Sequence, residues 1–184
     1  NVAGVAQPNG LSGKSLLPLL QGRAKSWREY LFTEYHTHSA HNYFPQRTVR
    51  NGRFKLIHNL QPNQINPGYD FTMNRFFPGL QKVIDQAEEP VRSAYALTKQ
   101  PPEFELYDLK SDPFEFRNLA NDGTYASPLN LLKQKLEKWR KETNDPFLDP
   151  KNLKRLKDEI NECFNDIQPS KKDLKMNYWN YFFE

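Results

Sequence analysis

Cysteine and long apolar runs are nearly absent from this sequence. Its 184 residues include one cysteine, Cys163, so no disulfide framework can hold the fold together. Cys163 falls on the apolar stripe of an expected helix, which favours a buried structural thiol over a reactive nucleophile. The longest apolar run, residues 16–20, contains a proline and is far shorter than the roughly 20 residues that span a bilayer. We therefore expect a fold held together by packing, with no membrane partner.

Complete catalytic motifs are also missing. No Gly-x-Ser-x-Gly sequence marks an activated serine, and residues 10–15 lack the spacing of a phosphate-binding loop. Asp108, Asp112 and Glu115 surround a proline and could suggest a calcium site. A turn followed by a helix cap explains the same pattern more simply. From these residues we expect no catalytic residue, no metal ligand and no cofactor in this chain.

The composition is that of a folded globular chain. Hydrophobic residues make up 37% of the sequence and aromatic residues 14%, whereas disordered chains are poor in aromatics. The net charge of +4 leaves two interpretations open. One is an acidic partner, such as a sulfated glycan, and the other is a solvated surface with a small basic excess. Lysines gather within residues 133–175, on expected amphipathic helices that need no partner, and we expect no nucleic acid.

Several segments predict strands of a small antiparallel sheet. Residues 30–35 and 104–109 are rich in aromatic and β-forming side chains. Residues 47–50 and 53–57 flank Asn-Gly, the pair that supplies two positive φ angles to a type I′ hairpin turn. Strands and helices in this order predict an α+β domain.

Helices are expected mainly in the second half of the chain. Side chains at helical spacing predict a helix over 128–143, which begins at Ser127-Pro128 and packs on the sheet. A second apolar stripe predicts a helix over 150–167, and the aromatic residues 177–183 are expected to dock on a neighbouring surface. Residues 60–102 form a long connection, helical in part.

The expected hairpin register gives one arginine an unusual position. With a two-residue turn, Val49 lies opposite Phe54 and Arg47 lies opposite Leu56. The apolar face of the hairpin then ends in Arg47. Such an arginine either extends to water along its methylene groups or is kept available for a partner.

Three histidines lie close together in the sequence, at His36, His38 and His41. On a strand, His36 and His38 would share a face, as ligands of one transition metal must. No cysteine or acidic motif with metal spacing lies nearby, so a polar loop is a second interpretation. In a third interpretation, Glu34, His36 and His38 line a pocket and bind an anionic or hydroxyl-bearing substrate.

Four segments, taken in this order, resemble the C-terminal region of the sulfatase family. Residues 10–22 look like the segment with which sulfatases leave their large alkaline-phosphatase-like domain, and residues 27–34 look like the strand that follows. Residues 47–57 resemble the signature hairpin of the family. Residues 105–120 match its closing stretch, ELYDL followed by DP, E and NLA. Shorter stretches, 43–47, 54–60 and 139–146, are similar to heparan N-sulfatases (sulfamidases).

The resemblance implies both a fold and a division of the chain. Sulfatases carry a small C-terminal antiparallel sheet packed against a helix. Residues 1–26 would be the exit segment from a catalytic domain, and Gly4 looks like the stop of a helix entered from upstream. Residues 27–146 would be the C-terminal subdomain, and residues 147–184 a helical and aromatic extension.

The resemblance also implies a reaction. The whole enzyme would remove sulfate, as sulfamate or ester, from a glycosaminoglycan-type sugar. It would use a formylglycine made within Cys/Ser-x-Pro-x-Arg and a calcium ion that polarises the sulfate. Cys163 is not followed by that motif, so we expect this chain alone to be inactive. A periplasmic, secreted or lysosomal compartment is implied as well.

In this family the C-terminal subdomain borders the mouth of the active site. We expect substrate contacts at Glu34, His36, His38 and Arg47, with Arg47 pairing with sulfate or carboxylate and the others binding sugar hydroxyls. Two alternatives are a stand-alone binding module for an acidic glycan and a histidine-based metal-binding domain.

Overall fold

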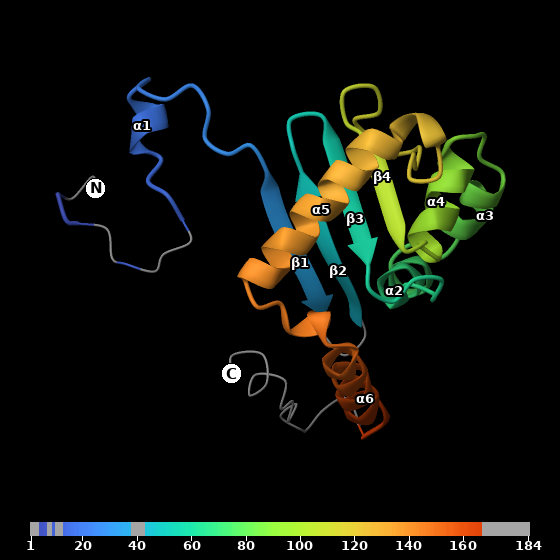
Figure 1. Cartoon of the computed structure of the whole chain (residues 1–184). Helices are drawn as coiled ribbons and strands as arrows, with labels where there is room; N and C mark the ends of the chain where they lie inside the picture. The colour runs from blue at the N-terminus through green and yellow to red at the C-terminus, as the bar shows by residue number, and fades with distance from the viewer. Residues whose placement is uncertain (1–3, 7–8, 10–12, 38–42, 167–184) are drawn as a thin grey trace.

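A four-stranded antiparallel sheet forms the centre of the domain (Figure 1). The computed structural model describes residues 4–6, 9, 13–37 and 43–166. The strands are β1 (Leu31–Thr37), β2 (Tyr43–Arg50), β3 (Phe54–Asn59) and β4 (Phe104–Asp108), and they lie side by side in that order. The α+β architecture predicted from the sequence is confirmed.

The hairpin between β2 and β3 differs from the predicted one. Val49 pairs with Leu56 and Arg47 pairs with His58, so the register is shifted by two residues. The Asn51 N–H donates to the Phe54 carbonyl over 3.0 Å. The Asn51 side chain accepts from the N–H groups of Arg53 and Phe54 at 2.8 and 2.7 Å.

The predicted type I′ turn is therefore wrong, because neither Asn51 nor Gly52 has a positive φ. The Asn51 side chain caps a Gly52-Arg53 turn instead, as an Asx turn does. A shift of two residues leaves every side chain on its predicted face, since the side-chain period of a strand is two.

One face of the sheet is covered by α5 (Ala126–Glu142), which crosses the strands diagonally in Figure 1. Its buried Leu132 and Leu136 pack with Val49, Leu56 and Leu106. The Trp139 ring stacks on Phe32, with 5.2 Å between ring centroids. This cluster is the main core of the domain. The apolar side chains of α5 that contribute to it are those that the helical spacing in the sequence predicted.

The first residue of α5 differs slightly from the predicted one. The prediction placed it at Ser127-Pro128, whereas the helix begins at Ala126, directly after the 3-10 turn η1 (Gly123–Tyr125). The Asp122 carboxylate accepts from the Thr124 N–H at 3.0 Å. Because this cap starts the turn earlier, Ser127 lies within the first turn of α5 and makes no cap.

The connection between β3 and β4 is more helical than predicted. It contains α2 (Pro67–Arg75), α3 (Leu80–Asp85) and α4 (Val91–Lys99), which gather beside the sheet near β4 (Figure 1). Asn66 begins α2, because its side chain accepts from the Gly68 N–H at 3.0 Å and a proline follows.

The last described helix, α6 (Pro150–Asp166), packs against one end of the sheet. Its Leu156 and Ile160 form a second core with Tyr43 and with Phe147 of the short turn η2 (Pro146–Leu148). The Tyr43 hydroxyl also donates to the Leu153 carbonyl over 3.1 Å. The helix predicted over 150–167 is therefore present through residue 166.

Some predictions fall outside what the structure describes. These are the burial of the Cys163 side chain, the placement of His38 and His41, and the docking of residues 177–183. The proposed divisions at residues 26 and 146 also stay predictions. The shortest helix, α1 (Leu17–Leu20), lies in the segment that leads to β1. None of the helices in the described ranges has the length and apolar character needed to cross a bilayer.

Candidate functional site

A buried arginine–carboxylate pair anchors the cluster that contains three of the four predicted site residues. The Arg47 side chain on β2 has 0% exposure. Its Nε and Nη2 donate to the two carboxylate oxygens of Asp145 at 2.8 and 2.7 Å. Its Nη1 donates to the Gln46 carbonyl at 2.9 Å. This planar, two-pronged geometry is the strong form of an ion pair.

Asp145 also ties α5 to the turn that follows it. Arg140, in the last turn of α5, donates from Nε to Asp145 at 2.6 Å and from Nη2 to the Phe147 carbonyl at 2.9 Å. The Phe147 N–H donates back to Asp145 at 3.0 Å. Burial raises the pKa of Asp145, but the bonds and charge of Arg47, helped by Arg140, hold that pKa below its usual range. Asp145 is therefore a carboxylate at neutral pH.

Glu34 forms the accessible end of the cluster, and the His36 imidazole, 17% exposed with a buried Nε2, lies beside it. Both come from β1, and Glu34 pairs with Arg47 across the sheet. The Glu34 Oε2 lies 3.7 Å from His36 Nε2 and 3.8 Å from Arg47 Nε, and the Glu34 side chain is 52% exposed. Its pKa is lowered, first by the adjacent His36 imidazole and also by the Arg47 charge, while burial opposes the shift.

Phe147 supplies an apolar wall to this cluster. Its ring lies edge-on to the His36 imidazole, with 5.0 Å between ring centroids. The Arg47 guanidinium lies over the same ring at 5.1 Å. These contacts restrict the orientation of His36 from one side, while Glu34 contacts it from another.

His58 lies beside Arg47 on β3. Burial, followed by the charges of Arg140, Lys133 and Arg47, lowers the pKa of His58 to about 4. The ring also stacks on Phe104 at 4.5 Å. His58 is thus a neutral partner in the positively charged surroundings of the arginines.

The formal charges of the cluster cancel. Arg47 and Arg140 are balanced by Asp145 and Glu34, so no cationic side chain is left over to attract a sulfate. The accessible polar group is the Glu34 carboxylate, which accepts hydrogen bonds. That chemistry suits hydroxyl groups better than anions.

The structure brings Glu34, His36 and Arg47 together, and His38 lies outside the described residues. Arg47 does not face solvent, because Asp145 holds it. Sequence reasoning kept Arg47 available for a substrate and missed Asp145, which occupies its guanidinium. The local sequence around Asp145, Asn-Asp-Pro, indicates only the stop of the preceding helix, and the separation of 98 residues from Arg47 hid the pairing.

The acidic residues near Pro113 have protein partners. Asp108 accepts from the Arg53 guanidinium at 2.7 Å, and Glu115 accepts from Lys55 at 2.6 Å. Asp112 accepts from the Arg117 N–H at 2.8 Å. Within the described part of the chain, no three His, Cys, Asp or Glu side chains gather as a metal site would require.

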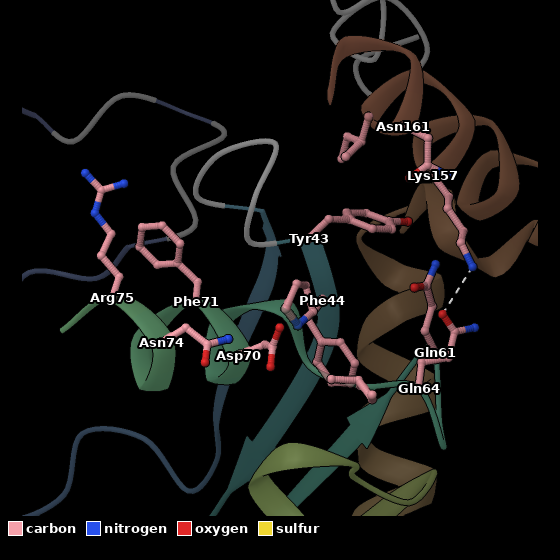
Figure 2. A pocket seen from close by; sticks show the side chains of 13 residues that line it. Tyr43, Phe44, Gln61, Gln64, Asp70, Phe71, Asn74, Arg75, Lys157 and Asn161 are labelled. Atoms are coloured by element: carbon pink, nitrogen blue, oxygen red, sulfur yellow. Dashed lines mark hydrogen bonds between the residues drawn. The ribbon is translucent and has the colours of Figure 1, made fainter. Parts of the chain in front are cut away.

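A pocket of about 770 Å³ opens between α2 and α6, away from the residues predicted as a site. Tyr43 and Phe44 of β2 lie between the two helices, and the other lining residues project from both sides (Figure 2). Sequence reasoning missed this pocket, because its lining residues come from three separate stretches of the chain, 43–44, 61–75 and 157–161. No local pattern connects them.

The N-terminal half of the chain matches a known domain. Residues 1–89 match the family model described as N-sulphoglucosamine sulphohydrolase, C-terminal. Over 144 residues the chain is 32% identical to human N-sulphoglucosamine sulphohydrolase, covering 75% of this chain and 28% of that protein. It is 32% identical over 146 residues to an ulvan-active sulfatase of Formosa agariphila, covering 78% and 27%.

Solved structures agree with these matches. A 2-O GAG sulfatase superposes with a TM-score of 0.53 at 26% identity, covering 79% of this chain and 23% of that one. A protein solved in complex with its substrate D-glucosamine-2-N,6-O-disulfate gives a TM-score of 0.51 at 26% identity, covering 78% and 22%. The chain thus spans about a quarter of the length of these relatives, and the matching part is their C-terminal region.

Proposed function

Since this chain belongs to the sulfatase family, of which it carries the C-terminal region, we propose that the protein containing it hydrolyses sulfate from glycosaminoglycan-type sugars. The match of residues 1–89 to the C-terminal domain model carries this proposal. The named substrates of the relatives, N-sulphoglucosamine and a disulfated glucosamine, support a sulfated amino sugar. Sulfamate and ester remain the two forms to test.

The proposed role of this chain is scaffold and one wall of the substrate pocket. Glu34 would accept hydrogen bonds from sugar hydroxyls, and His36 and His38 would supply further polar contacts. Arg47 would act through Glu34, since its guanidinium lies 3.8 Å from that carboxylate and pairs fully with Asp145. Held in this way, the Glu34 carboxylate keeps a fixed position for a substrate.

The chemistry itself would lie in the catalytic domain. By family, a formylglycine nucleophile and a calcium ion supply it. The described residues offer no cluster of three metal-ligand side chains, so we assign no calcium ligand and no catalytic step to this chain. We propose that the 184-residue chain alone releases no sulfate.

The test is sulfate release by the protein at its natural length. Purified protein would be incubated with glucosamine bearing an N-sulfate, a 6-O-sulfate or both, and free sulfate measured by ion chromatography. The proposal expects release from at least one of these, and none from the isolated 184-residue chain. Absence of release from all three, with the formylglycine verified by mass spectrometry, would refute the proposed function.

A further inference from the structure

The pocket between α2 and α6 has the lining of a binding site, and the proposed function does not use it. Its volume of about 770 Å³ falls within the range of roughly 300–1,000 Å³ typical of small-molecule sites. Its lining combines apolar and polar side chains. Phe44 and Ile160 supply apolar surface, while amide, carboxylate and cationic side chains supply polar groups, namely Gln61, Gln64, Asp70, Asn74, Arg75, Lys157 and Asn161.

One amide side chain in this pocket is available to a ligand. Gln61 is 8% exposed and lines the pocket, where Figure 2 shows its amide beside Lys157 and Gln64. Among the described residues, the Gln61 amide has no hydrogen-bond partner. The amide atoms are not among the buried, unpaired polar atoms of the described residues, so solvent reaches them and a ligand can bond to them as donor or acceptor.

The surrounding amides are suited to hydroxyl groups. Asn74 on α2 and Asn161 on α6 line opposite sides of the pocket. Each amide offers both donors and an acceptor, as a polyhydroxylated ring requires. The Tyr43 ring projects between the helices, and its hydroxyl is already bonded to the Leu153 carbonyl. Because Tyr43 is largely buried in the second core, it fixes the floor of the pocket between the two helices.

The charges favour an acidic ligand. Lys157 and Arg75 are opposed by the single carboxylate of Asp70, which leaves an excess of one positive charge in the lining. The Lys157 ammonium donates to a neutral acceptor, Gln64 Oε1, at 3.1 Å. The Arg75 guanidinium lies over the Phe71 ring at 5.5 Å. Neither is neutralised by a carboxylate within the described residues, so both can pair with an anion.

We propose that the α2–α6 pocket binds one acidic sugar unit of a glycan. The inference rests on the proposed function for the class of ligand, a glycan with carboxylate or sulfate groups. Lys157 pairs with the anionic group, and the Gln61 and Asn161 amides bond to ring hydroxyls. Neither Glu34 nor His36 lines this pocket, so it is a second contact point in addition to them.

The test is a titration of the natural-length protein with a size-defined heparin tetrasaccharide, in which isothermal titration calorimetry measures the binding. The Lys157→Ala variant removes a cation from the pocket. The matched control is Lys154→Ala, which removes an identical charge from an exposed position on the same helix. We expect Lys157→Ala to weaken binding about five- to tenfold and the control to weaken it less than about twofold.

A second variant tests the amides. Asn161→Ala, at an exposed position of α6, is expected to weaken binding about threefold or more, and thermal unfolding confirms that each variant is folded. Maltotetraose, which carries no charge, should bind far more weakly than the heparin tetrasaccharide. Equal effects of Lys157→Ala and Lys154→Ala would overturn the proposal, since they would reflect surface charge alone.

The two proposals can fail separately. If sulfate is released but Lys157→Ala binds the tetrasaccharide as the unmodified protein does, the pocket assignment is wrong and the proposed function stands. If binding depends on Lys157 but no sulfate is released, the glycan site stands without the hydrolytic function.

Discussion

Arg47 and Asp145, 98 residues apart in the sequence, form a two-pronged ion pair in which neither side chain is exposed by more than 1%. The pair joins the central strand β2 to the turn that follows α5. It therefore connects the sheet, the covering helix and the accessible carboxylate of Glu34. Charges removed from water in this way depend on each other, because either one alone would be left uncompensated.

Neutralising Asp145 should therefore destabilise the domain strongly. In Asp145→Asn the shape is kept, but Arg47 and Arg140 lose their shared counter-charge. We expect a loss of about 3 kcal/mol in the free energy of unfolding, measured by urea denaturation. The control Asp158→Asn removes an exposed carboxylate that pairs with Lys154, and should change stability by less than about 0.5 kcal/mol. Similar losses in both variants would show that the buried pair has no special role.

The depressed pKa of His58 predicts a loss of stability in mild acid. The folded protein keeps His58 neutral down to a pKa of about 4, while the unfolded chain binds a proton near its ordinary value of about 6.5. Between these values the unfolded state holds more protons, so stability falls as the pH falls. From pH 7 to pH 5 we expect a loss of about 1–2 kcal/mol from this group.

His58→Gln removes that titration and should reduce the loss between pH 7 and pH 5. Urea denaturation at both values measures it. Asp145 and Glu34, whose pKa values are lowered, contribute stability that is lost only at more acidic pH, so they do not obscure this range. An identical pH dependence in the variant would mean that His58 is not the group responsible.

The turn between β2 and β3 gives a third prediction. Gly52 has no positive φ, and a Cβ atom added there would contact nothing within 4 Å. Gly52→Ala should therefore be neutral or stabilising by up to about 1 kcal/mol. Asn51→Ala, which removes two hydrogen bonds, should cost about 1 kcal/mol. A type I′ turn would give a different result for Gly52→Ala, a clear destabilisation, and thermal denaturation distinguishes the two.

The faces of the sheet could be predicted from the sequence, whereas the exact turn could not. Alternation placed Val49, Leu56 and Arg47 on one face, and a register error of two residues preserved that result. The Asn-Gly rule failed because the Asn51 side chain offers its own cap to the backbone. Local rules cannot decide between two such hydrogen-bonding arrangements, which differ little in free energy.

The candidate site was predicted only in part, for a related reason. Glu34 and His36 stood out because they are polar residues at a strand position. Arg47 stood out because it ends an apolar face. Asp145 carried only the signal of a helix stop, and its contact with Arg47 arises from the way α5 crosses the sheet. Long-range pairings of this kind depend on packing, which sequence spacing does not encode.

The kinetics of a Glu34 variant test the central claim most directly, namely that this C-terminal region forms one wall of the substrate pocket of a sulfatase. Steady-state sulfate release from sulfated glucosamine would be compared for the natural-length protein, Glu34→Gln and the control Glu137→Gln, an exposed carboxylate on α5. We expect Glu34→Gln to raise KM about tenfold, the loss of one or two hydrogen bonds to the sugar, with kcat changed much less. Kinetic constants of Glu34→Gln that match those of Glu137→Gln would contradict the account.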